Sequence, residues 1–389
     1  MIGIKDAINL VASSTIKLDS IDSELIDALN YNLSEDIYSN MDMPPFSQSA
    51  MDGYAICGDG DGFDVLGEIK AGDTDQYNLT DGQAYRIFTG AMIPEGTTAI
   101  AKQEIVERSI DKIQVQEKIK QGTSIRLKGE EIRSGQIVLK AGTKINPAAI
   151  GLLSGLGVSK VKVIKQPITT LVVTGDELIQ LGEELKLGKI YESNSYMLKS
   201  ALLNSGFDSN IVLVKDNYLE TKNRIESAIE TSDLVIITGG ISVGDYDFVG
   251  KALNEIGVKE LFYKVNQKPG KPLFYGEKNN VKIFALPGNP AAALTCFYVY
   301  VLLAIKLMMG CPGPGLTKRK ARITHDYIKK GDRSHLLKAQ LNNDEVIVHK
   351  GQSSAMLSSF VDTNCLVYIS GEVTEVKTGE ELEVYMLPI

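Results

Sequence analysis

Three apolar segments, each followed by a glycine-containing loop and then a helical pattern, constrain the fold of this chain most strongly. They are ITTLVVT (168–174), DLVIIT (233–238) and VKIFAL (281–286), and a fourth strand-like segment, SNIVLVKDN, covers 209–217. Between them, apolar spacing predicts helices near 195–204, 221–230 and 249–256. Continuous apolar strands that alternate with helices are typical of a parallel sheet covered on both faces. The sequence therefore predicts a three-layer α/β/α domain.

A chain of 389 residues is too long for one ordinary core, and its patterns change along its length. We expect a multidomain α/β plus β protein. A helical platform is predicted from residues 1–45 and 134–166, a β-rich module inserted into it from 46–133, the α/β domain from 167–312, and a small barrel-like β domain from 313–389. Within the platform, apolar spacing predicts two helices over residues 1–33 and a third over 147–157.

Composition excludes several classes of function. The net charge of −8 argues against a general nucleic-acid-binding surface. Four cysteines without CxxC spacing and three histidines, all beyond residue 320, disfavour a zinc site or a Ser-His-Asp triad. The N-terminus carries internal charges and does not resemble a signal peptide, so a cytoplasmic location is expected.

Residues 291–309 form an apolar run nearly long enough to span a bilayer. The run begins directly after Gly288-Asn289-Pro290, contains Lys306, and has no counterpart elsewhere in the chain. A helix buried against the sheet explains it better than a membrane span, so no membrane partner is expected.

The carboxyl ends of parallel strands are the usual ligand-binding edge of such a sheet. Three loops are expected there: Thr174–Glu177, Thr238–Asp247 and Leu286–Pro290. Their glycines let backbone amides approach an anion closely, although a single glycine turn is often no more than a turn. None matches a Walker P-loop or a GxGxxG fingerprint, which disfavours an ordinary ATPase or dehydrogenase.

Four carboxylates lie in these loops: Asp176, Glu177, Asp245 and Asp247. Helix capping alone would explain Asp176. For Glu177 and Asp247 together we favour a divalent cation, Mg²⁺, shared with phosphate oxygens.

A lysine-rich segment, KVNQKPGKP, covers residues 264–272. Lys264, Lys268 and Lys271 are stiffened by two prolines and can present positive charge to an oxyanion or phosphate. The alternative is an ordinary solvated face. Two loops of the inserted module, Ser49–Tyr54 and Phe88–Ala91, are further candidates that could also be simple turns.

Seven strings in this order carry a resemblance to a known family: PPFSQSAMDGYAI, RIFTGAMIP, TGDEL, SNSYML, GGISVGDYDFV, KPGKP and LPGNPAAAL. Together they resemble the molybdopterin molybdenumtransferases (MoeA, and the E domain of gephyrin) from about residue 3 to the C-terminus. The resemblance implies a molybdopterin-binding-type α/β domain, four domains in all, and an elongated homodimer with its site in a cleft between subunits. It implies that adenylyl-molybdopterin and molybdate are converted to molybdenum cofactor and AMP with Mg²⁺. The resemblance also implies transient contact with the molybdopterin adenylyltransferase and with recipient molybdoenzymes.

The same resemblance suggests roles for individual positions. Asp52, Glu177 and Asp247 look catalytic, and Glu177 and Asp247 also look like metal ligands. Substrate-binding positions are Thr89, Gly90, Asp176, Asp216, Gly239, Gly240, Ser242, Lys264, Lys268, Lys271, Pro287, Gly288, Asn289, Pro290, Ser353 and Ser354.

Two positions depart from the family pattern. Glu131 stands where an aspartate is frequent, and Ala291-Ala292 stand where Val-Ser is common, which removes a hydroxyl at a helix start. The alternatives are the preceding step, adenylylation of molybdopterin with ATP, and a scaffold role without catalysis. The sequence does not distinguish molybdate from tungstate.

Overall fold

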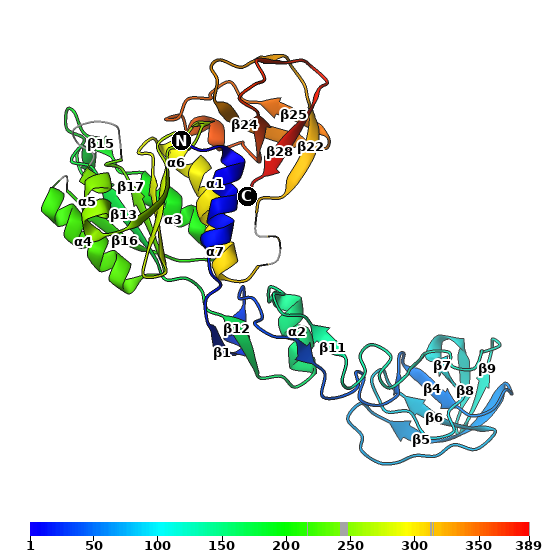
Figure 1. Ribbon diagram of the computed structural model, residues 1–389. Helices are drawn as coiled ribbons and strands as arrows, with labels where there is room; N and C mark the ends of the chain where they lie inside the picture. Colours follow the sequence, from blue (N-terminus) through cyan, green and yellow to red (C-terminus); the bar gives the residue numbers. More distant parts are fainter. Residues whose placement is uncertain (216, 242–247, 312, 314, 389) are drawn as a thin grey trace. The chain divides into compact units, whose positions relative to one another are not determined.

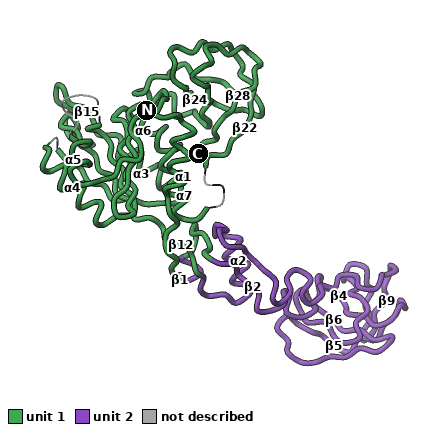
Figure 2. The backbone as a smooth tube through the Cα atoms, viewed as in Figure 1, with its two compact units in different colours: residues 1–23, 28–34, 162–389 green, residues 24–27, 35–161 purple. Residues whose placement is uncertain are grey.

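The computed structural model describes residues 1–215, 217–241, 248–311, 313 and 315–388. Two compact units are present, one made of residues 1–23, 28–34 and 162–389 and the other of residues 24–27 and 35–161 (Figure 2). The predicted platform is divided between these units: residues 1–23, 28–34 and 162–166 belong to the larger one, and residues 24–27, 35–45 and 134–161 belong to the smaller one.

The larger unit contains a six-stranded sheet in the order β16-β13-β17-β21-β20-β18. The strands are β13 (Thr169–Thr174), β16 (Asn210–Val214), β17 (Leu234–Thr238), β18 (Lys259–Tyr263), β20 (Phe274–Lys278) and β21 (Val281–Leu286). Neighbours among β16, β13, β17 and β21 run parallel, as predicted. However, β20 is antiparallel to β21 and β18 is antiparallel to β20, so the predicted parallel sheet has an antiparallel edge.

The cause of this antiparallel edge is the connection between β20 and β21. Only Asn279 and Asn280 join these strands, and both have positive φ, 52° and 69°. Two residues of this conformation make a tight hairpin turn, whereas a parallel pair needs a long crossover.

Helices cover both faces of the sheet, which confirms the three-layer prediction (Figure 1). Successive side chains of β17 point to opposite faces: Leu234 and Ile236 join one core, and Val235 and Ile237 join the other. The second core is closed by α4 (Tyr218–Thr231) and α5 (Phe248–Ile256). The first is closed by α1 (Ile4–Ser14), α3 (Asn194–Asn204) and the helical segment 290–308. Helix α1 therefore belongs to this core, not to the platform in which we expected residues 1–33.

The apolar run is a core helix, as predicted. It comprises α6 (Pro290–Cys296), one π-helical turn (Phe297–Val301) and α7 (Leu302–Met308). Among the described residues this is the helix long and apolar enough to cross a membrane, but 89% of its most apolar stretch is buried inside the protein.

The second predicted N-terminal helix is absent. Residues 20–24 form strand β1 (Ser20–Glu24), and one 3₁₀ turn follows over Leu25–Ala28. Ile21, Ile26 and Leu29 have the spacing of a helix face, yet all three are exposed. Leu25 and Ala28 are buried, so the predicted face is buried only in part, and short Ser and Asp side chains that hydrogen-bond to the backbone disfavour a helix.

The smaller unit is built mainly from strands. Helix α2 (Pro147–Gly155) is present as predicted and is capped by the Asn146 side chain, which accepts a 2.8 Å bond from the Ala149 amide. The paired strands are β2 (Ile37–Tyr38) with β11 (Ile137–Leu139), and β3 (Gln48–Ser49) with β10 (Ile125–Arg126). The β-rich module forms a sheet from β4 (Gly53–Ile56), β5 (Gly62–Ile69), β6 (Gln83–Ile87), β7 (Ala99–Lys102), β8 (Val106–Ser109) and β9 (Lys112–Val115), with a 3₁₀ turn at Gln103–Ile105.

The C-terminal region is a closed barrel, as predicted. Its strands are β22 (Lys318–Ile323), β24 (Ser334–Asn342), β25 (Glu345–Val348), β26 (Cys365–Ile369) and β28 (Glu381–Met386), and the pairing of β24 with β26 closes it. A sixth strand, β19 (Gln267–Lys268), comes from the lysine-rich segment and pairs with β24. Smaller elements are β14 (Leu178–Ile179) with β15 (Ile190–Tyr191), β23 (Tyr327–Ile328) with β27 (Glu375–Val376), and a 3₁₀ turn at Ser358–Phe360.

Candidate functional site

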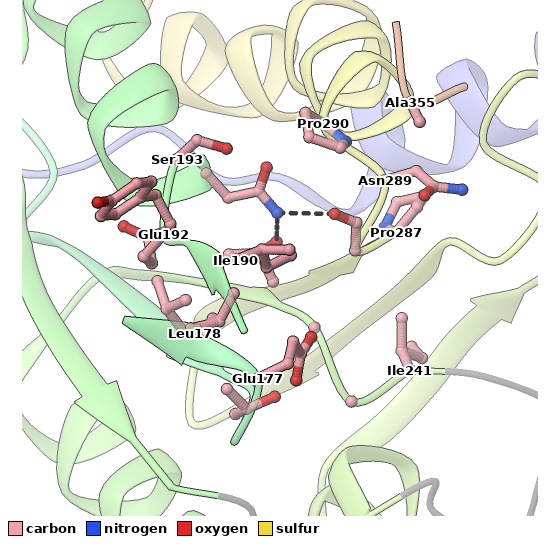
Figure 3. Close-up of a pocket in the computed structure, with 18 of the residues that line it drawn as sticks. Glu177, Leu178, Ile190, Glu192, Ser193, Ile241, Pro287, Asn289, Pro290 and Ala355 are labelled. Carbon is pink, nitrogen blue, oxygen red and sulfur yellow. Dashed lines mark hydrogen bonds between the residues drawn. The ribbon is translucent and has the colours of Figure 1, made fainter. Parts of the chain in front are cut away.

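A cavity of about 570 Å³ opens beyond the carboxyl ends of β13, β17 and β21 (Figure 3). All three predicted loops contribute to its lining, through Thr174 and Glu177, through Thr238–Ile241, and through Pro287–Pro290. Strand β15 and the start of α3 complete the wall, with Ile190 and Tyr191 followed by Glu192–Asn194. The strand edge predicted to bind a ligand is thus a cavity in the structure.

Asn194 connects two of these loops. Its Nδ2 donates to the hydroxyl of Thr238 at 2.9 Å and to the carbonyl of Gly288 at 2.8 Å. One amide group therefore holds the ends of β17 and β21 at a fixed spacing. The sequence analysis quoted Asn194 within SNSYML but did not select it; its position at the start of a predicted helix was the available signal.

Gly239 satisfies two steric requirements at the end of β17. Its φ is 88°, in the region that L side chains rarely adopt. A Cβ built there would lie 2.2 Å from the backbone oxygen of Thr174. The close approach of β13 and β17 at the cavity wall thus requires glycine.

Two neighbouring acids of the TGDEL loop differ in position. Glu177 lines the cavity, and no hydrogen bond or ion pair involves its carboxylate within the described part of the chain. Asp176 does not line the cavity; its carbonyl accepts a 2.6 Å bond from Lys189. The described residues contain no group of three His, Cys, Asp or Glu side chains that could hold a metal. Of the predicted residues, Asp216, Ser242, Asp245 and Asp247 lie outside the described residues.

A second acid, Glu192, lines the cavity and was missed by the sequence analysis. It is 2% exposed, and its carboxylate accepts bonds from the Ser195 amide at 2.8 Å and the Ser195 hydroxyl at 2.5 Å. These bonds satisfy donors in the first turn of α3, so the observed role of Glu192 is to fix the helix that carries Asn194.

A second cavity of about 620 Å³ shares Pro272, Pro287 and Asn289 with the first. Four cationic side chains line it: Lys268 and Lys271 from the lysine-rich segment, and Arg333 and Lys350 from the barrel. Ser353 and Ser354 line it as well, and the described lining contains no Asp or Glu. Unopposed cations with hydroxyl donors make this cavity suitable for an oxyanion.

Arg333 and Lys350 were not predicted. They come from two loops of the barrel that have no recognisable motif, and only the folded barrel brings them to the lysine-rich segment.

The turn that carries Lys268 and Lys271 is held by a buried polar network. The Gln267 side chain is fully buried, donates to the Gly270 carbonyl at 3.2 Å and accepts a 2.5 Å bond from the Tyr300 hydroxyl. Gly270 has a φ of 86°, and a Cβ there would lie 2.5 Å from the Cys296 sulfur. The lysines are thus attached to a turn of fixed shape.

Ser354 attaches the barrel to the start of α6. Its hydroxyl accepts a 3.0 Å bond from the Asn289 amide group, and its carbonyl accepts a 3.1 Å bond from the Ala292 N–H. Ala292 has no side-chain hydroxyl, and its backbone N–H is satisfied instead by the carbonyl of Ser354 in a barrel loop.

Lys264 lies outside both cavities, in contrast to the expectation from the motif. Its ammonium group is 4.7 Å from the ring centre of the adjacent Tyr263.

In the smaller unit, Asp52 and Thr89 lie within hydrogen-bonding distance of each other. Asp52 Oδ1 accepts bonds from the Thr89 amide and the Thr89 hydroxyl, both at 2.8 Å. These bonds, the backbone one first, hold the pKa of the Asp52 carboxyl below its usual value. Gly90, with a φ of 83°, supplies the turn that follows.

Comparison with known proteins gives consistent matches along the chain. A family model of the MoeA N-terminal region (domain I and II) matches residues 2–157, a probable molybdopterin binding domain matches 170–306, and the MoeA C-terminal region (domain IV) matches 320–387. Molybdopterin molybdenumtransferases from Staphylococcus epidermidis and Staphylococcus aureus are each 31% identical, over 99% of this chain and 95% of the relative.

Solved structures agree. A molybdopterin biosynthesis MoeA protein from Pyrococcus horikoshii OT3 is 30% identical, with a TM-score of 0.83 and full coverage of both chains. A molybdenum cofactor biosynthesis protein from Pyrococcus furiosus is 20% identical with a TM-score of 0.62, a likeness that concerns the fold alone. Because the full-length relatives exceed 30% identity and the three family models follow one another from residue 2 to residue 387, the chain belongs to the MoeA family of molybdopterin molybdenumtransferases.

Proposed function

We propose that this chain inserts molybdate into adenylyl-molybdopterin, releasing AMP and forming molybdenum cofactor. The supporting observation is the pair of adjoining cavities: one is lined by glycine loops and by Glu177, whose carboxylate has no partner among the described residues, and the other by four cations and two serines. A nucleotide-bearing substrate and a small dianion need two such sites side by side.

The adenylylated pterin is assigned to the first cavity. Gly239, Gly240 and Gly288 line it, so the substrate can approach backbone amides without steric conflict from side chains. Asn289 and Pro290 belong to the same wall. Asn194 keeps the two glycine loops in register, which preorganises the site before substrate binds.

Molybdate is assigned to the second cavity. Lys268, Lys271, Arg333 and Lys350 offset its double negative charge, and the hydroxyls of Ser353 and Ser354 supply further donors. The wall shared by the two cavities supports this assignment, because the transfer of molybdenum requires the oxyanion to bind beside the pterin.

Glu177 is the proposed ligand of a divalent cation. Its carboxylate lines the first cavity without a partner in the described part of the chain, and Mg²⁺ commonly uses one or two carboxylates together with substrate phosphate. When bound, the ion neutralises charge on the phosphoanhydride that is cleaved. Asp247 is the proposed second ligand, on the basis of its motif.

Asp52, Thr89 and Gly90 of the inserted module are proposed to complete the site from a second copy of the chain. The hydrogen bonds from Thr89 favour the ionised form of Asp52. This is the form that binds a cation or accepts a proton from the substrate. A cytoplasmic homodimer that exchanges substrate with the adenylyltransferase and product with recipient molybdoenzymes is part of the same proposal.

The first test incubates the purified chain with adenylyl-molybdopterin, Mg²⁺ and molybdate and follows AMP release. We expect release to depend on molybdate and the product to activate a cofactor-free molybdoenzyme. Glu177→Gln should abolish release while pterin binding persists.

The same experiment addresses both alternatives. Consumption of ATP with molybdopterin would identify the preceding adenylylation step. Tight binding of the adenylylated pterin without AMP release, with either molybdate or tungstate, would support a scaffold role instead.

A further inference from the structure

Two lysines of the barrel are buried without a carboxylate partner. Lys338 is 1% exposed and Lys329 is 4% exposed, and no ion pair involves either within the described residues. A buried ammonium group is costly unless its donors are satisfied, and an apolar side chain of similar size often gives equal or better stability. Their presence at these two positions therefore calls for a specific reason.

Lys338 lies directly behind one wall of the second cavity, the proposed oxyanion site. Its Nζ donates to the carbonyls of Ser353 at 3.3 Å and Met356 at 2.8 Å, and lies 5.8 Å from the centre of the Phe360 ring. Its backbone N–H donates to Oε1 of Gln352 at 3.0 Å. Gln352 and Ser353 line the cavity, so the side chain and the backbone N–H of Lys338 both hold this wall in place.

Lys329 lies behind the loop that carries Arg333. Its Nζ donates to the carbonyls of Gly331 at 2.6 Å, Arg333 at 3.2 Å and Gly371 at 3.0 Å. These three bonds use every donor of the ammonium group. The Arg333 guanidinium is in turn held by a 3.2 Å bond to the Gln267 carbonyl. Lys329 thus fixes the backbone of the residue whose side chain lines the cavity.

We infer that Lys329 and Lys338 are positioning residues for the oxyanion: each holds one of the two barrel loops that line the second cavity, and each adds a positive charge behind the wall. Burial lowers the pKa of the Lys338 ammonium group. The inference rests on the proposed function for the identity of the oxyanion.

The test uses the full-length chain and two readouts. Direct calorimetric titration with molybdate gives a Kd that does not depend on turnover, and AMP release gives KM for molybdate and for adenylyl-molybdopterin. For Lys338→Met and Lys329→Met we expect the Kd and KM for molybdate to rise by about tenfold, while KM for adenylyl-molybdopterin changes by less than about twofold. Failure of the wild-type chain to release AMP would refute the proposed function, but the titration would still test this inference.

Lys282→Met is the matched control. Lys282 is also buried, at 2% exposed, but it pairs with Glu277 at 2.6 Å in the α/β sheet and lines neither cavity. Its molybdate Kd should equal that of the wild type.

Hydrogen exchange separates positioning from a general loss of stability. Lys338→Met should speed exchange of the amides at residues 351–357 and Lys329→Met those at 330–334, with the rest of the barrel unchanged. If a lysine variant does not fold, Ser359→Ala loosens the first loop more mildly, because its hydroxyl donates to the carbonyl of Gly351 at 2.6 Å. An unchanged molybdate Kd in variants with faster loop exchange would overturn the inference.

Discussion

At the level of single residues, the side-chain amide of Asn194 connects two elements of the first cavity that are far apart in the sequence. Its two bonds reach the end of β17 and the loop after β21, and both partners line the same cavity. The side chain therefore contributes to stability and to site geometry at once, and one substitution can test the two contributions separately.

Asn194→Ala removes both bonds. We expect the free energy of unfolding to fall by about 1–2 kcal/mol and kcat/KM for adenylyl-molybdopterin to fall by about tenfold, since the loops lose their fixed spacing. Asn204→Ala is the control, because Asn204 lies on the same helix and its side chain donates to the Pro388 carbonyl, away from the cavity. Equal kcat/KM in the two variants would contradict a role in positioning.

His335 predicts a pH dependence of stability. It is 2% exposed and, together with the nearby Lys268, Lys329 and Arg333, its burial lowers its pKa to about 4, from 6.5. Between pH values of about 6.5 and about 4, His335 is protonated in the unfolded chain but not in the folded chain. The free energy of unfolding therefore falls as the pH is lowered through this range, by up to about 3 kcal/mol.

Denaturant unfolding at pH 7 and pH 5 measures this loss. In His335→Gln, which cannot be protonated, the difference between the two pH values should shrink. An identical pH dependence in both proteins would show that other groups cause it.

At the level of elements, the two-residue strand β19 joins the lysine-rich segment to the barrel. Gln267 and Lys268 pair with Ser334 and His335, and the Gln267 side chain is anchored to Tyr300 of the core helix. The shape of the KPG turn is thus set by an element on each side.

Tyr300→Phe removes the hydroxyl that donates to Gln267 and leaves a buried amide oxygen unsatisfied. We expect a loss of about 1–3 kcal/mol in the free energy of unfolding and a higher Kd for molybdate, measured by denaturation and titration. Tyr298→Phe, two residues away on the same helical segment, makes no bond to Gln267 within the described residues and should leave the Kd unchanged.

Elements whose apolar faces are buried were predictable. The strands β13, β17 and β21 are continuous apolar runs, and their order with α3 to α5 matched the prediction. The structure of residues 21–29 was not predicted correctly, because Ile21 and Ile26 have the spacing of a helix face but are exposed. The antiparallel edge depended on a two-residue turn at Asn279-Asn280, which the apolar pattern alone does not reveal.

At the level of the whole molecule, an acidic chain concentrates cations in one cavity. The net charge is −8, yet Lys268, Lys271, Arg333 and Lys350 share a lining that has no described acid. The lysines of the KPGKP motif were predictable, but Arg333 and Lys350 were not, because only the closed barrel brings them to the motif. The carboxyl-end loops were predictable as a site because strand direction alone places them together.

Molybdate affinity should therefore depend on ionic strength. Raising NaCl from about 50 mM to about 500 mM should increase KM for molybdate several-fold, because salt screens charges on partly exposed side chains. Lys350→Met should reduce that salt dependence. A KM that does not change with salt would indicate recognition by hydrogen bonds alone.

Residues of both the α/β domain and the barrel line the second cavity. Because half of its cations come from the α/β domain and half from the barrel, an oxyanion bound there connects the two, and binding free energy becomes resistance to their separation. Molybdate-starved protein would open at this joint more often and be cut there sooner by a protease. The cellular lifetime of the protein would then follow the supply of the oxyanion that it consumes.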